Sequence, residues 1–202
     1  MEKPANSQYP IHELLQRRWS LLAFSQQPVE KEKLCCLLEA ARWAASSYNE
    51  QPWHFIVATQ ENPEEFQRLL SCLAEGNQIW AQNAPVLMLS VAKLYFEKNH
   101  TENRHAFHDV GAAACSLAIE ATSLGLFIHQ MAGFDVSKAR KLYNIPEGYE
   151  PVAAIAIGYQ GDHEALPEQY RKRDFAPRQR KSLDTFVFAG TWGNTSPVIL
   201  ID

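Results

Sequence analysis

The sequence is poor in cysteine and has neither a long apolar run nor a basic excess. Its four cysteines are Cys35, Cys36, Cys72 and Cys115; none forms a C-x-x-C pair and all lie in apolar helical patterns. We therefore expect reduced, buried thiols in a cytoplasmic protein, not a zinc site. Apolar stretches fall far short of the roughly 20 residues of a membrane helix. The N-terminus lacks the apolar segment of a signal peptide.

The charge balance excludes one large class of partners. A formal net charge of −4 argues against a general nucleic-acid binder. A content of 46% hydrophobic and 21% charged residues is ordinary for a globular protein, and no linker or repeat divides the chain. We expect a single domain over residues 1–202, with a flexible N-terminus at residues 1–10.

The common catalytic signatures are missing as well. There is no G-x-G-x-x-G, no P-loop and no G-x-S-x-G elbow. His105, His108 and Asp109 share a helical spacing that could ligate a metal, but no third ligand follows at an obvious spacing. A solvated or core-capping helix face explains them better. We therefore assign no metal site. No pair of carboxylates suggests general acid–base catalysis, so we assign no catalytic residue.

Hydrophobic periodicity predicts helices that alternate with a few strands. Strands are expected at residues 53–59, 85–92, 127–131 and 151–159. Helices are expected at residues 11–18, after Pro28 as far as residue 45, after the Asn62-Pro63 cap, at 103–124 up to Gly125, and from Asp135 to about Asn144. The pattern indicates a layered sandwich of helices and sheet rather than a β-barrel.

Polar residues concentrate in three places. Arg17 and Arg18 lie near the N-terminus and Arg178 and Arg180 near the other end, and Ser20 adds a hydroxyl. Arginine matches phosphate oxygens, although such a pair read alone is more often part of a solvated surface. Between a helical run and a strand, "SSYNEQPWHF" (46–55) offers many hydrogen-bonding groups on one short loop.

Five stretches in order resemble the flavin-dependent nitroreductase family, from about residue 11 to residue 193. They are "LLQRRWSLLAFSQQPVEKEKL", "AARWAASSYNEQPWHFIVAT", "HDVGAAACSLAIEATSLGLFIHQMAGFD", "IPEGYEPVAAIAIGY" and "RQRKSLDTFVFAGTWG". The second is similar to the family's most specific motif. The resemblance implies an α+β three-layer sandwich with a mixed or antiparallel central sheet. It also implies a homodimer with FMN at the interface, and a C-terminal tail (about residues 181–202) exchanged across it.

The resemblance also assigns the cofactor site. The FMN phosphate would be bound by Arg18, Ser20, Arg178 and Arg180, with Trp19 at the same site. Residues 46–51 would make hydrogen bonds to the flavin ring and the ribityl chain. Gly133 would let the backbone approach the ring, because it has no side chain. The implied FMN-binding residues are Arg17, Arg18, Trp19, Ser20, Leu22, Ser46, Ser47, Tyr48, Asn49, Gln51, Gln130, Met131, Ala132, Gly133, Arg178 and Arg180. The implied reaction is ping-pong hydride transfer from NAD(P)H, through the flavin, to nitroaromatic, quinone or related acceptors.

Two departures from the family pattern leave alternatives open. Leu22 stands where a basic residue is usual, which implies weaker flavin binding or a shifted redox potential, and Ala45 replaces a proline. A specialised reductase or dehydrogenase of one metabolite would keep the fold and change the acceptor, whose recognition we expect around residues 94–108 and in the tail. A flavin-binding or flavin-sequestering protein with little turnover is the third reading.

Overall fold

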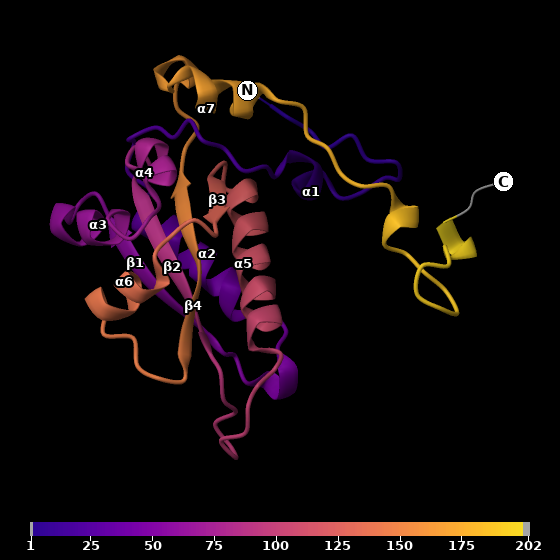
Figure 1. Cartoon of the computed structure of the whole chain (residues 1–202). Helices are drawn as coiled ribbons and strands as arrows, with labels where there is room; N and C mark the ends of the chain where they lie inside the picture. Colours follow the sequence, from indigo (N-terminus) through magenta and orange to yellow (C-terminus); the bar gives the residue numbers. More distant parts are fainter. Residues whose placement is uncertain (1, 200–202) are drawn as a thin grey trace.

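A computed structural model describes residues 2–199 as helices packed around one antiparallel sheet (Figure 1). The strands are β1 (Trp53–Thr59), β2 (Val86–Lys93), β3 (Phe127–Met131) and β4 (Tyr149–Gly158). Their order is β1-β2-β4-β3, and every neighbouring pair is antiparallel. The predicted strands are thus confirmed, with ends that differ by at most two residues. The central strands β2 and β4 make the longest pairing.

Both faces of the sheet are covered because the inner strands are apolar on both sides. Along β2, Val86 and Met88 belong to one buried cluster, with helices α2 (Lys31–Arg42) and α5 (Ala106–Ser123). Leu87 and Leu89 belong to another, with α3 (Pro63–Leu70) and α4 (Glu75–Ala81). Successive side chains of a strand point to opposite faces of the sheet, so a continuous apolar run needs helices packed on both faces. The result is the predicted three-layer α+β sandwich.

Seven α-helices lie in the described residues. They are α1 (Glu13–Arg17), α2 (Lys31–Arg42), α3 (Pro63–Leu70), α4 (Glu75–Ala81), α5 (Ala106–Ser123), α6 (Val136–Leu142) and α7 (Glu168–Phe175). The periodicity analysis missed α4 and α7. Each is short, and α7 buries only Tyr170 and Asp174 among mostly charged neighbours. Such a helix carries no apolar stripe from which it could be predicted.

The predicted helix boundaries have the expected local chemistry. The Asn62 side chain accepts a hydrogen bond from the Glu65 amide (3.4 Å), with Pro63 in the first turn, and Asp135 accepts one from the Lys138 amide (2.8 Å). Side-chain acceptors at these positions satisfy amides that have no partner within the helix. Gly125 follows α5 with φ of 75°, a conformation that glycine adopts without strain.

The prediction of buried thiols is wrong for three of the four cysteines. Cys72 is buried, but Cys35, Cys36 and Cys115 are exposed in the single chain. Cys35 and Cys36 are consecutive on α2, so they cannot both point along one buried stripe. On α5 the alanines occupy the buried face and leave Cys115 outside it.

The last part of the chain leaves the body of the molecule. After α7 the backbone runs out beside α1 and ends in short turns away from the sheet (Figure 1). Phe186 and Trp192 are exposed there, Trp192 at 92%. Residues 200–202 of the predicted tail, and Met1 of the predicted flexible N-terminus, lie outside the described residues.

Candidate functional site

Three of the predicted arginines line one hollow of about 750 Å³. Arg18 follows α1, while Arg178 and Arg180 follow α7, so the fold brings together residues about 160 positions apart in the sequence. The remaining wall consists of Ala5, Asn6, Ser7, Gln8, Tyr9, Ile11, Leu15, Lys181, Ser182, Leu183 and Phe186. No aspartate or glutamate is among these lining residues.

The arginines of this hollow repel one another. Partial burial and the nearby charge of Arg180 lower the pKa of Arg18. Burial lowers the pKa of Arg178 too, and Arg18 and Arg180 lower it further. Among residues 2–199, none of the three pairs with a carboxylate at ion-pair distance. Such an uncompensated cationic cluster suits an anion with several oxygens, such as a phosphate.

Arg17 and Trp19 do not line the same hollow. Both border a separate hollow of about 230 Å³. Trp19 is only 5% exposed and belongs to the core, where its ring packs edge-on against Phe127 with 5.9 Å between ring centroids. The structure therefore does not place the Trp19 ring in the arginine cradle, as the sequence predicted. The arrangement follows from alternation along an extended segment, which turns Arg18 and Trp19 to different sides.

The side chain of Leu22 lies in the hydrophobic core at 2% exposure. Its backbone amide donates to the Asp174 carboxylate (Leu22 N to Oδ1, 3.0 Å), and the Ala23 amide donates to the other oxygen (3.2 Å). This contact ties the segment after Arg18 to α7. Within the single chain, the Leu22 side chain thus packs in the core and does not face a ligand. Ser20, by contrast, is exposed.

The predicted polar loop is a tight turn between α2 and β1. Tyr48, Asn49 and Gln51 have φ of 52°, 57° and 51°, values that residues other than glycine rarely adopt. Hydrogen bonds hold the turn: the Gln51 amide donates to Ser46 Oγ (3.0 Å), and the Ser47 amide donates to Asp109 Oδ2 of α5 (3.0 Å). Tyr48 is 93% exposed. Neighbouring structure therefore maintains a strained backbone, as is common at binding sites.

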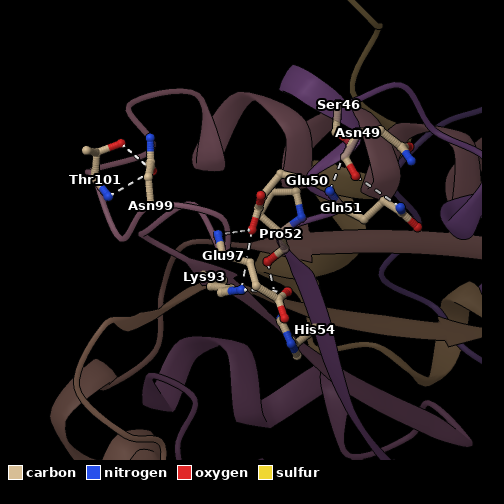
Figure 2. A network of polar contacts seen from close by, with 10 residues as sticks. All are labelled: Ser46, Asn49, Glu50, Gln51, Pro52, His54, Lys93, Glu97, Asn99 and Thr101. Carbon is tan, nitrogen blue, oxygen red and sulfur yellow. Dashed lines mark hydrogen bonds and ion pairs between the residues drawn. The ribbon is translucent and has the colours of Figure 1, made fainter.

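Glu50 connects this turn to the loop that follows β2 (Figure 2). Glu50 Oε1 accepts the Glu97 backbone amide (2.8 Å) and lies 3.3 Å from Lys93 Nζ, which also pairs with Glu97 (3.2 Å). The Glu50 side chain is only 10% exposed. The Tyr48 and Phe96 rings meet edge-on at 5.9 Å between centroids. The turn and the loop thus form one connected surface.

The residues predicted to line the ring lie at a third place. Ala132 and Gly133 line a hollow of about 460 Å³ beyond the end of β3, whereas Met131 is in the core and Gln130 is exposed. A Cβ on Gly133 would stand 2.7 Å from Asn77 Nδ2, which donates to the Gly133 carbonyl (2.9 Å). A side chain at position 133 would therefore displace the Asn77 amide from this hydrogen bond.

The predicted site residues of one chain do not meet in any one of the hollows described above. The arginine hollow, the Ser46–Gln51 turn and Ala132-Gly133 share no lining residue among the hollows described above. The possible metal triad is not assembled either: His108 Nδ1 lies 3.1 Å from Asp109 Oδ1, but residues 2–199 contain no group of three or more metal-ligating side chains.

The sequence analysis missed several residues that support these surfaces. Asp109 and Glu50 hold the turn, and Asp174 holds the segment after Arg18. Residues 5–9 line the arginine hollow. Glu50 lies within the polar loop and Asp109 within the His105–His108–Asp109 spacing, so both residues stood out in the sequence, but nothing there indicated that they support the turn. Residues 5–9 carry no such signal.

Comparison with known proteins agrees with the fold and the motifs. A sequence profile of the Nitroreductase family matches residues 15–159. An uncharacterized protein of Mycolicibacterium smegmatis is 39% identical over 65% of this chain and 86% of its own length. An FMN reductase [NAD(P)H] of Bacillus subtilis is 28% identical over 74% of this chain and 67% of its own length.

Solved structures show the same architecture. The crystal structure of an oxidoreductase containing FMN superposes with a TM-score of 0.88 at 34% identity, covering 94% of this chain and 96% of that chain. In residues 2–199 no helix is both long and apolar enough to cross a membrane. The profile match, the fold and the order of the motifs lead to one conclusion: the chain belongs to the nitroreductase family.

Proposed function

We propose that this protein is an NAD(P)H-dependent FMN oxidoreductase. The observation that carries the proposal is the hollow that gathers Arg18, Arg178 and Arg180, together with Lys181, without a carboxylate among its lining residues. A terminal phosphate with about two negative charges at neutral pH is the ligand group that such a cluster suits. The names of relatives that bind or reduce FMN support the same cofactor.

The residues of this chain bind and orient the cofactor rather than react. Arg18 and Arg180 would contact the phosphate, and the Ser46–Gln51 turn would supply donors and acceptors for the polar edge of the ring. Gly133 has no side chain that could obstruct a flat ring approaching its backbone. FMN, when bound, supplies the chemistry of accepting hydride from a nicotinamide and passing it to an acceptor. No side chain is then needed as general acid or base.

The site is completed by a second copy of the chain. One chain does not bring its arginines, its turn and its Gly133 into one hollow, so a homodimer can combine the turn of one copy with the arginines of the other. The tail from about residue 181 has its largest apolar side chains in solvent, among them Phe186 and Trp192. Exposed apolar surface of this kind marks an interaction site, and the partner copy is its occupant.

The acceptors are nitroaromatics, quinones or related compounds, and the reaction is ping-pong because donor and acceptor use one site in turn. A cytoplasmic location fits the supply of NAD(P)H. A second function, flavin binding with little turnover, is favoured by one observation: Leu22, where the family pattern has a basic residue, is apolar and its side chain is buried. A reductase or dehydrogenase specialised for one metabolite would share the site and differ in the acceptor.

A visible spectrum recorded anaerobically tests the proposal. The purified protein, supplied with FMN, is expected to hold a flavin whose absorbance bleaches when NADH or NADPH is added. Arg18→Ala should weaken FMN binding by about 1.5–3 kcal/mol, the contribution of a charged hydrogen bond. Arg68→Ala, at a half-buried arginine of α3 that pairs with Glu64 and Glu65, is the matched control. Bound flavin that neither donor bleaches would favour flavin binding without turnover.

A further inference from the structure

The N-terminal segment forms part of the wall of the arginine hollow. Residues 5–9 line it together with Arg18, Arg178 and Arg180, and they bring the side-chain donors of Asn6, Ser7 and Gln8. The periodicity of the sequence gives these residues no role. Their position beside three uncompensated cations is a property of the folded chain alone.

Lys3 and Ala5 anchor this segment to the rest of the fold. The Lys3 ammonium donates to the backbone carbonyl of Asp174 and lies 4.7 Å from the centroid of the Trp19 ring. The Ala5 amide donates to the Gln16 carbonyl (2.8 Å) at α1. A cation over an indole face and a hydrogen bond to a carbonyl stabilise the same placement of the Lys3 side chain. The segment is therefore fixed at two points, one of them at the edge of the hollow.

Arg178 provides a third attachment. Its Nη1 donates to the carbonyl of Lys3 and to that of Gln16, at 2.6 Å each. One guanidinium thus joins the N-terminal segment, α1 and the chain that follows α7. Burial and the nearby Arg178 lower the pKa of Lys3, and the Asp174 charge opposes this effect, which agrees with their close packing. Arg178 has a positioning role here that Arg18 and Arg180 do not share.

We propose that residues 2–9 are an N-terminal strap that forms one side of the phosphate site. Lys3 and Arg178 hold the strap, and Asn6 and Ser7 donate hydrogen bonds to the phosphate end of the ligand. The strap contributes to affinity for a phosphorylated flavin and not to affinity for the ring. This inference rests on the proposed function, because it takes FMN as the ligand.

The test compares two flavins that differ only in the phosphate. Dissociation constants for FMN and riboflavin are measured by quenching of flavin fluorescence, using the full-length protein, a variant lacking residues 2–9, and Lys3→Met. Lys3→Met removes the ammonium and keeps the aliphatic chain over Trp19. Lys141→Met, an exposed lysine in the last turn of α6, is the matched control. Circular dichroism confirms that each variant is folded.

Both strap variants are expected to bind FMN about tenfold more weakly, which corresponds to roughly one lost hydrogen bond. Riboflavin affinity should stay the same, as should FMN affinity in the control. Unchanged FMN affinity in the folded strap variants would overturn the proposed role of the strap in phosphate binding, while leaving the cofactor proposal in place. An equal loss for both flavins would also overturn it, since the strap would then support the fold and not the phosphate. Failure of the full-length protein to bind either flavin would overturn both proposals.

Discussion

At the scale of single residues, Leu22 changes the interpretation of the cofactor site. The resemblance to nitroreductases places a basic residue at this position near the flavin, and a cation there would be expected to strengthen binding. In this chain the Leu22 side chain is packed in the core between the sheet and its helices. The surrounding chain is held by the Asp174 carboxylate through backbone amides. The leucine therefore belongs to the packing of the domain.

Leu22→Arg is expected to destabilise the protein instead of tightening FMN. A cation forced into this apolar site without a partner should lower the free energy of unfolding by about 3–5 kcal/mol. Leu22→Met keeps the apolar volume and should change it by less than about 1.5 kcal/mol. Denaturant unfolding of the two variants measures both effects. If Leu22→Arg were as stable as the native protein and bound FMN more tightly, the core position of this side chain would be refuted.

His129 makes stability depend on pH. Its Nδ1 lies 2.9 Å from the Leu21 carbonyl, and burial lowers the pKa of the ring from its ordinary value of 6.5. Below pH 6.5 the unfolded chain takes up a proton at this residue while the folded chain resists it. Stability should therefore fall as the pH drops below 6.5, until the pH reaches the lowered folded pKa.

The pH effect can be isolated by substitution. His129→Asn should give a flatter profile of melting temperature against pH in the acidic range than the native protein. His100→Asn, at an exposed loop position, should retain the native profile. A His129→Asn profile as steep as that of the native protein would assign the acid sensitivity to another group.

At the scale of elements, the turn between α2 and β1 is held by contacts from outside itself. Three residues with left-handed backbone conformations cost about 1–3 kcal/mol each when they are not glycine. Asp109 of α5 and the Glu50–Lys93–Glu97 contacts offset that strain. The same contacts join the turn to the loop at residues 94–102, the first part of the region in which the sequence predicted acceptor recognition.

Glu50→Ala should loosen both segments together. The Glu97 amide would lose its acceptor, and its hydrogen exchange should accelerate by a factor that corresponds to about 1–3 kcal/mol. Amides of the Ser46–Gln51 turn should exchange faster in the same variant. Glu61→Ala, at an exposed site after β1, serves as the control. Faster exchange confined to the loop, with the turn unaffected, would show that the two segments are independent.

At the scale of the whole molecule, the proposed site requires two chains. Light scattering of the flavin-loaded protein should give twice the 22.9 kDa mass of the chain. A variant ending at Lys181 lacks the exposed Phe186 and Trp192. Its dimer should therefore dissociate at a higher protein concentration than the native dimer, and FMN should be released when the two chains separate. A monomer that retains FMN would contradict the composite site. Emission of Trp192 should also shift to shorter wavelength on dimer formation, because its indole leaves water.

The sequence by itself determined the sandwich, because its signals are local. Two-residue alternation and continuous apolar runs identified all four strands, and Asn62, Asp135 and Gly125 marked helix ends through chemistry within a few residues. Only the tertiary structure decided which arginines meet, since Arg18 and Arg180 converge through the path of the chain between them. It also decided that Leu22 and Trp19 enter the core, that residues 5–9 reach the arginine hollow, and that three cysteines face outward. Burial depends on what packs against a residue, and no pattern within its own segment contains that information.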